Sequence, residues 1–331
     1  MGFDAPWRVI HDAEWVYARP LASRRSWVWA TPFLLAAGVE ATLFLADLLW
    51  PVLPFWRWGA DGMLVEPWIQ MPWMILLAGL AVAVFVVWAR WFERRGFASL
   101  GLVDPLWGKR LLWGLAAGCM LVILIDGLGG LLTLLTGGLD GETDGWFWVW
   151  RLRILAGLGL SDWARLLAFG CGVALYACAE EVVFRGWLLS AIAARWGVGP
   201  AVLLTSALFA AVHAHLFGAG LLFGSFSMIA LALTGIAFSL LALSQKSLFG
   251  AMGLHVGFNV VMIGGAALDN LNTEPALSMN AALAQALDIA ALWADGQVLI
   301  PSWYDLAAAT VFAALSLLLI DVLRKQRRHF A

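Results

Sequence analysis

Residues 171–189 read CGVALYACAEEVVFRGWLL, an apolar stretch that contains Glu180, Glu181 and Arg185. A charge at the centre of a bilayer costs about 2.5–3.5 kcal/mol, so each of these residues needs a physical reason. Glu181 and Arg185 lie four residues apart, with the acid before the base, and can form an ion pair on one helix face. Glu180 lies about 100° round the same helix and can face another group. Alternatively, all three form a charged cluster that snorkels to the cytosolic interface.

The composition of the whole chain is that of a membrane protein. Of its 331 residues, 63% are hydrophobic and 13% are charged, and the mean hydropathy is +0.86. A soluble domain carries about 25% charged residues, so this chain could not cover a water-exposed surface. Its 21 Trp residues are typical of the boundary between lipid and water. The net charge of −2 provides no basic surface for phosphates and excludes nucleic acid as a partner.

Apolar runs predict an all-α fold, a polytopic bundle of about eight transmembrane helices. The predicted spans are 27–50, 71–91, 111–136, 166–188, 201–221, 223–244, 248–266 and 304–323. Every second connection is basic, including the 90–110 loop and the C-terminal RKQRR, whereas the others are acidic or mixed. By the positive-inside rule, both termini should therefore lie in the cytosol. We expect an integral protein of the plasma (inner) membrane if the source is prokaryotic.

Two further spans carry histidine in apolar sequence. The fifth contains His213, four residues after Phe209, and the seventh contains His255, four residues before Asn259. Residues four apart share a helix face, so each pair can address one cavity. The topology brings Glu180 and His255 to similar depth near the cytosolic side, with His213 somewhat deeper. Each His could instead be a packing residue, but several ionisable groups at one depth favour a functional site.

These residue types can hydrolyse a peptide bond. Glu180 is the candidate base, because desolvation raises the proton affinity of a carboxylate and lets it take a proton from water. His213, His255 and Asn259 are candidate donors to the carbonyl oxygen as it becomes negative. The alternative is a Zn²⁺ ion held by Glu180, His213 and His255, which is a known catalytic ligand set. No helix carries HExxH, so we prefer a reaction that needs no cofactor.

Three ordered motifs resemble one known family. They are EEVVFR at 180–185, FAAVH at 209–213 and HVGFN at 255–259. They match the pattern EExxxR, FxxxH and HxxxN of the CPBP (Abi) family, which includes the type II CAAX prenyl endopeptidases. The likeness covers roughly residues 110–266, and GFASLGLVDP at 96–105 resembles the amphipathic lead-in that precedes the family core.

The resemblance implies an intramembrane protease that opens to the cytosolic side. It implies that Glu180 activates water and His213 orients it, while His255 and Asn259 stabilise the oxyanion. Glu181 and Arg185 would support the site, as would Phe209. Because family members are described both as metalloproteases and as glutamate-dependent proteases, the resemblance leaves the metal question open.

The expected organisation has three segments. Residues 1–110 hold two spans and the lead-in, 111–266 form the protease core, and 267–331 hold an interfacial helix or loop and the final span. The expected substrate is a membrane-anchored peptide or protein, prenylated or linked to bacteriocin self-immunity according to the resemblance. A non-catalytic peptide-binding or immunity protein that uses the same cavity is the alternative. A proton-coupled transporter is disfavoured because no inverted repeat is visible.

Other polar and small residues have simpler interpretations. Three acidic residues are expected to face water or to pair within the bundle, namely Glu40, Asp47 and Asp126. Two pairs of glycines at four-residue spacing predict close helix packing, namely Gly220 with Gly224 and Gly253 with Gly257.

Overall fold

The computed structural model describes residues 17, 27–49, 67–135, 147–273 and 303–328, and the regular structure among them is helical. The helical elements are η1 (Val28–Ala30), α2 (Thr31–Leu49), α3 (Pro67–Val87), η3 (Trp88–Phe92), η4 (Phe97–Leu100), α4 (Trp107–Leu135), α5 (Phe147–Gly157), α6 (Leu160–Glu181), η5 (Val182–Leu188), α7 (Leu189–Trp196), α8 (Val198–Ala211), η6 (Ala214–Ala219), α9 (Leu221–Gln245), α10 (Phe249–Thr273) and α12 (Trp303–Arg328).

Among the described residues, seven stretches of helix are long and apolar enough to cross a bilayer. They are Thr31–Leu49, Met74–Phe92, Trp107–Leu132, Leu160–Trp196, Gly224–Gln245, Phe249–Leu268 and Leu306–Lys325. Large apolar side chains lie on the outer surface, with Phe33 73% and Trp91 80% exposed. Lipid can cover such a surface at no hydrophobic penalty, whereas water cannot. The predicted all-α polytopic bundle is confirmed, and the chain is an integral membrane protein. The orientation of its termini stays a prediction.

The fifth predicted span, 201–221, is wrong as a continuous helix. Helix α8 has 14 residues, a length of about 21 Å, and ends at Ala211. The imidazole Nδ1 of His213 contacts the carbonyl of Phe209 at 2.9 Å, and the His213 backbone N–H donates to Ala210 instead. The His213 imidazole therefore occupies the Phe209 carbonyl, which the His213 backbone N–H would bind if α8 continued. The helix ends there and the chain continues into η6.

The fourth and seventh predicted spans are longer in the structure than in the sequence analysis. Residues 166–188 belong to a continuous helical stretch from Leu160 to Trp196, of which Val182–Leu188 is π-helical. Helix α10 continues past residue 266 to Thr273. The rest of the predicted interfacial segment, 274–302, lies outside the described residues.

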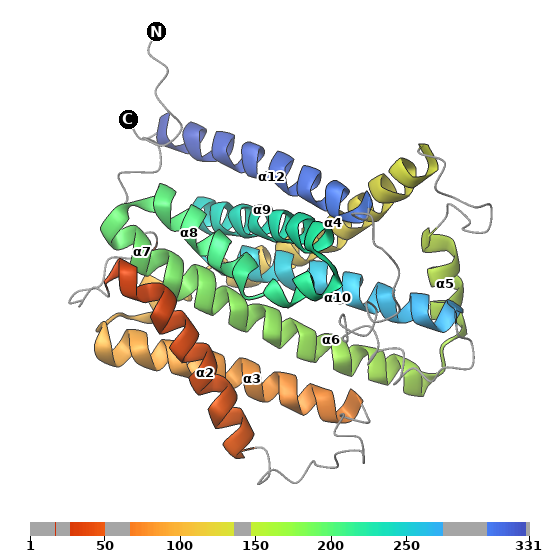
Figure 1. Cartoon of the computed structure of the whole chain (residues 1–331), viewed down its shortest axis with the longest axis horizontal. Coiled ribbons are helices and arrows are strands. Elements are labelled where there is room, and N and C mark those ends of the chain that lie inside the picture. Colours follow the sequence, from red (N-terminus) through yellow and green to blue (C-terminus); the bar gives the residue numbers. More distant parts are fainter. Residues whose placement is uncertain (1–16, 18–26, 50–66, 136–146, 274–302, 329–331) are drawn as a thin grey trace.

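Helix α10 lies at the centre of the bundle (Figure 1) and packs against α4, α6 and α9. Helix α12 covers α4 and α9 on one edge, while α3 packs on α6 and α2 packs on α3 at the other. The helix that carries His255 is therefore enclosed by other helices rather than by lipid.

A seam of small residues brings α10 and α4 into backbone contact. A Cβ atom at Gly253 would lie 2.1 Å from the Leu111 carbonyl oxygen, and one at Gly257 would lie 2.2 Å from that of Leu115. Any larger side chain would push the helices apart. The predicted close packing of Gly253 and Gly257 is confirmed, and these two residues flank His255 on α10.

The other glycine pair does not pack two helices together. Gly220 lies just before α9 with a φ of 121°, a backbone conformation that favours glycine. Gly224 makes room for the ring of Phe217 in the adjoining η6. The prediction for this pair is wrong because the chain turns at Gly220.

The three acidic residues of the other spans have different surroundings. Glu40 and Asp47 are exposed on the outer face of α2. Asp126 of α4 forms the predicted pair within the bundle, because its carboxylate lies 2.9 Å from the Arg151 guanidinium of α5.

Candidate active site

The centre of the site is the junction between α6 and η5. Glu180 and Glu181 are the last two residues of α6, and Arg185 lies within the π-helical turn that follows. A π-helical turn carries one extra residue and is found most often where a helix presents functional side chains. The local sequence EEVVFRGWLL contains no Pro that would force this geometry, so side-chain contacts must stabilise it.

The predicted ion pair between Glu181 and Arg185 is present and fully buried. The Arg185 Nη1 atom lies 2.9 Å from Glu181 Oε1, and both side chains are 0% exposed. A cluster that snorkels to the interface, the simpler alternative, is therefore wrong for these two residues. Buried charges of this kind require a partner and further hydrogen bonds.

Aromatic rings and a helix carbonyl complete the surroundings of Arg185. Its guanidinium carbon lies 4.4 Å from the centre of the Phe209 ring and 5.3 Å from that of Phe238. Its Nη2 atom donates to the Gly235 carbonyl of α9 at 3.3 Å. Cation–π contacts and hydrogen bonds together hold the guanidinium in one orientation.

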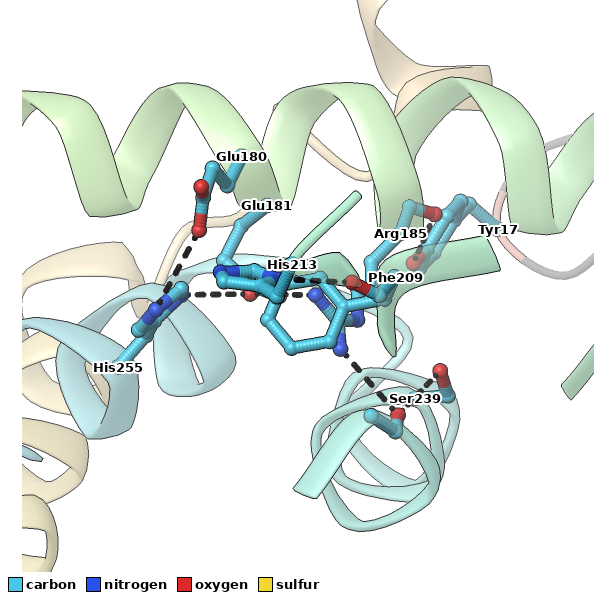
Figure 2. Close-up of polar contacts among 9 residues, drawn as sticks. Tyr17, Glu180, Glu181, Arg185, Phe209, His213, Ser239 and His255 are labelled. Atoms are coloured by element: carbon cyan, nitrogen blue, oxygen red, sulfur yellow. Dashed lines mark hydrogen bonds and ion pairs between the residues drawn. The ribbon is translucent and has the colours of Figure 1, made fainter. Parts of the chain in front are cut away.

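His255 bridges the two glutamates, as Figure 2 shows. Its Nδ1 atom lies 2.9 Å from Glu181 Oε1, the oxygen that also accepts from Arg185. Its Nε2 atom lies 3.6 Å from Glu180 Oε2. Because Nδ1 donates to a carboxylate, the ring orientation is fixed and Nε2 is directed at Glu180. Glu180 is 17% exposed and Glu181 is 0% exposed, so Glu180 is the more accessible of the two carboxylates.

Phe209 of α8 and His213, two residues beyond the end of that helix, reach the same cluster. The Phe209 ring is 2% exposed, and its centre lies 5.2 Å from that of His213 and 6.1 Å from that of His255. Phe209 thus lies close to both imidazoles and also covers Arg185. Phe209, which was predicted only to support the site, lies at the centre of the cluster (Figure 2).

Asn259 lies one helical turn beyond His255 on α10 and is half-buried. The spacing of four residues directs both side chains to the same side of the helix. The glycine seam with α4 fixes the position of both residues at once.

Two features of this cluster were missed by the sequence analysis. Glu181 contacts His255 as well as Arg185, and the hydroxyl of Tyr17 donates to the backbone carbonyl of Arg185 at 3.0 Å. Residues 181 and 255 are 74 positions apart, and residues 17 and 185 are 168 apart. Helical periodicity relates neighbours within one helix, so it holds no signal for either contact.

The predicted zinc ligands do not assemble into a metal site. Among the described residues, no three His, Cys, Asp or Glu side chains are placed to hold a metal ion. The Nδ1 atom of His213 contacts the Phe209 carbonyl, and both nitrogens of His255 face carboxylates. In this arrangement the set Glu180, His213 and His255 does not fit three-ligand zinc coordination.

Comparison with protein families identifies one domain in the chain. Residues 162–261 match the family model described as Type II CAAX prenyl endopeptidase Rce1-like. This stretch runs from α6 to α10 and contains all three motifs, EEVVFR, FAAVH and HVGFN. No curated protein and no solved structure matches the chain. The predicted resemblance is confirmed, and the domain is of a protease family, whereas the boundaries predicted for the three segments stay predictions.

Proposed function

We propose that this chain, whose residues 162–261 form an Rce1-like domain, is an intramembrane endopeptidase that uses water activated by Glu180. The observation that carries the proposal is the contact of His255 with both Glu180 and Glu181. A structural ion pair needs only Glu181 and Arg185. The imidazole and the second carboxylate add a donor and a base on the more accessible side.

Glu180 is the proposed base. It takes a proton from water while the water oxygen adds to the carbonyl carbon of the scissile peptide bond. The same carboxyl then returns this proton to the leaving amine, the C–N bond breaks, and an acid and an amine are released. This sequence needs no covalent intermediate and no proton source other than the attacking water.

His255 and Asn259 are the proposed donors to the oxyanion. Because His255 Nδ1 contacts Glu181, only a protonated ring has a second N–H to donate, at Nε2. Glu181 Oε1 lies 2.9 Å from both His255 Nδ1 and Arg185 Nη1, so the ring is held with Nε2 directed away from Glu181. Asn259 supplies an amide N–H from the next turn of α10. His213, at the end of α8, is the proposed group that orients the water.

The proposed substrate is a membrane-anchored peptide or protein, and the domain family favours one with a prenylated cysteine. A helix in the bilayer has all its backbone groups paired, so a substrate must present an extended segment to the site. A bond close to the anchored end of a chain meets this requirement without unwinding a whole span.

The first test uses a defined probe in liposomes. The probe is a fluorescence-quenched peptide with a farnesylated cysteine followed by three residues, here called the prenyl-peptide probe. We expect Glu180→Gln to lower its cleavage by about 10²–10⁴-fold, the usual contribution of a general base. Asp126→Asn is the matched control, since it makes the same chemical change elsewhere in the bundle and should cleave at the wild-type rate.

The second test identifies the natural substrate. Membrane peptides and proteins are compared by mass spectrometry between cells with wild-type protein and cells with Glu180→Gln. We expect products that depend on Glu180. If the wild-type protein binds peptides in the membrane but produces none, the non-catalytic alternative is correct and the peptidase proposal is wrong.

A further inference from the structure

The π-helical turn of η5 has backbone carbonyls that are held by side chains. In an α-helix the N–H of Leu189 would donate to Arg185, but here it donates to Phe184, five residues back. The carbonyl of Arg185 instead accepts the hydroxyl of Tyr17 at 3.0 Å. Burial raises the pKa of that phenol, which keeps its proton available for donation.

The next two carbonyls accept a hydroxyl from within the helix. The Ser190 Oγ atom contacts the carbonyl of Trp187 at 3.0 Å and also that of Gly186. Ser190 is 0% exposed, so no bulk water competes for these acceptors. Three successive carbonyls of the turn that carries Arg185 are thus bound by two hydroxyl groups.

Arg95 orients the Ser190 hydroxyl. Its Nη2 atom donates to Ser190 Oγ and, at 2.9 Å, to the Ser99 carbonyl, while Nη1 pairs with Glu93 at 3.0 Å. Because the Ser190 oxygen accepts from a cation, its single hydrogen is directed to the helix carbonyls. Arg95 was predicted as one of several basic loop residues, yet it is only 1% exposed. Burial lowers the pKa of its guanidinium, and the Glu93 carboxylate opposes that shift.

The loop around Arg95 also contacts the helix that carries His255. A Cβ atom at Gly186 would lie 3.2 Å from the Leu100 carbonyl and 3.1 Å from the Leu248 side chain. The Leu248 N–H, directly before α10, donates to the Gly101 carbonyl at 3.0 Å. The lead-in therefore packs on both halves of the site, η5 and the start of α10.

We propose that Tyr17, Arg95 and Ser190 are positioning residues of the peptidase, which hold the η5 turn so that Arg185 and Glu181 keep His255 in place. The contacts of Tyr17 and Ser190 described above reach backbone carbonyls of η5, and Arg95 reaches them through the Ser190 hydroxyl, so the three residues act through the backbone. Three contacts link the Tyr17 hydroxyl to the His255 ring, through Arg185 and Glu181. Tyr17 and Arg95 lie outside the matched range 162–261. This inference rests on the proposed function.

The test removes single hydroxyl groups. Tyr17→Phe and Ser190→Ala are compared with Ser316→Ala, whose buried Oγ donates to the Phe312 carbonyl at 2.8 Å in α12, far from the site in sequence. We expect the first two variants to lower kcat on the prenyl-peptide probe by about 10–100-fold with KM unchanged, the effect of a small misplacement. Ser316→Ala should keep the wild-type kcat.

A second measurement needs no substrate. Amide hydrogen exchange of residues 182–188, followed by mass spectrometry, should become faster in Tyr17→Phe and Ser190→Ala but not in Ser316→Ala. Unchanged exchange and kcat in both variants would overturn the proposal. If Ser190→Ala does not fold, Tyr17→Phe still decides it, since only one oxygen is lost. If the wild-type protein leaves the probe intact, only the peptidase function is contradicted. Amide hydrogen exchange still shows whether Tyr17 and Ser190 hold the η5 turn, because it is measured on that turn directly.

Discussion

Two of the buried arginine–carboxylate pairs, one within the matched domain and one outside it, have different surroundings. The N–O distance is 2.9 Å in both, between Arg185 and Glu181 and between Arg151 and Asp126. The first pair is 0% exposed and shares its carboxylate oxygen with His255. The second is 8–11% exposed and joins α5 to α4, outside the matched domain. The second pair thus joins two helices, whereas the first also orients the imidazole of a proposed catalytic residue.

The largest effect is expected from Glu181→Gln. This change leaves the Arg185 charge without its ionised partner in a dry environment, which costs about 3–5 kcal/mol. It also replaces the carboxylate that orients His255 by a neutral amide, whose NH2 group can only donate. Cleavage of the prenyl-peptide probe should fall by about 10³–10⁴-fold, as when an orienting carboxylate is lost beside a catalytic histidine. Thermal unfolding in detergent and initial rates measure the two effects.

Glu180→Gln is the control for this experiment. Glu180 is partly exposed and has no arginine partner among the contacts described above. Its loss should therefore lower cleavage by about the same 10²–10⁴-fold as above, with little change in unfolding temperature. Wild-type rates in folded Glu181→Gln protein would mean that the Glu181–Arg185 pair has only a structural role, like the Asp126–Arg151 pair.

A somewhat smaller loss is expected from Asn259→Ala. Removing one oxyanion donor lowers kcat by about 10²–10³-fold, with KM and stability nearly unchanged. Asn259→Asp keeps the size of the side chain but, when ionised, has no N–H to donate, and should be as inactive as the alanine variant. An active Asn259→Asp enzyme would exclude the donor role.

A change in stability alone is expected from Asp126→Asn. The Arg151 guanidinium then loses its ionised partner, and the free energy of unfolding should fall by about 1–3 kcal/mol. The kcat/KM of the folded fraction should equal that of the wild type, because α5 contributes none of the proposed catalytic residues. A large loss of kcat/KM in well-folded protein would place the second pair within the catalytic site.

The sequence predicts contacts within one helix well. The spacing of four identified the Glu181–Arg185 pair, and the apolar runs identified the bundle, because both depend on local geometry. The Gly253/Gly257 seam was also predicted, since small residues at that spacing let two transmembrane helices approach closely. The same spacing at Gly220 and Gly224 misled, because Gly220 lies in a turn.

Contacts between distant segments were not predictable. Nothing in EEVVFRGWLL marks the π-helical turn, which depends on hydroxyl groups of Tyr17 and Ser190 and on the buried Arg95. The end of α8 depends on the side chain of His213, whose contact with Phe209 replaces a backbone hydrogen bond that hydropathy assumes to exist. Such features arise from tertiary partners, and a single sequence does not record which partners meet.

The smallest effect is expected when both members of the second pair become apolar. The change Asp126→Leu/Arg151→Leu removes both charges of the pair together, and replacing a buried ion pair by apolar residues is often neutral or stabilising. Unfolding should therefore stay within about 1 kcal/mol of the wild type, and cleavage should be unchanged. The same double change at Glu181 and Arg185 should give a folded but inactive protein, because leucine cannot accept the His255 Nδ1–H. Equal activity in the two double variants would remove the distinction between the pairs, and with it the reason to assign Glu181 a part in catalysis.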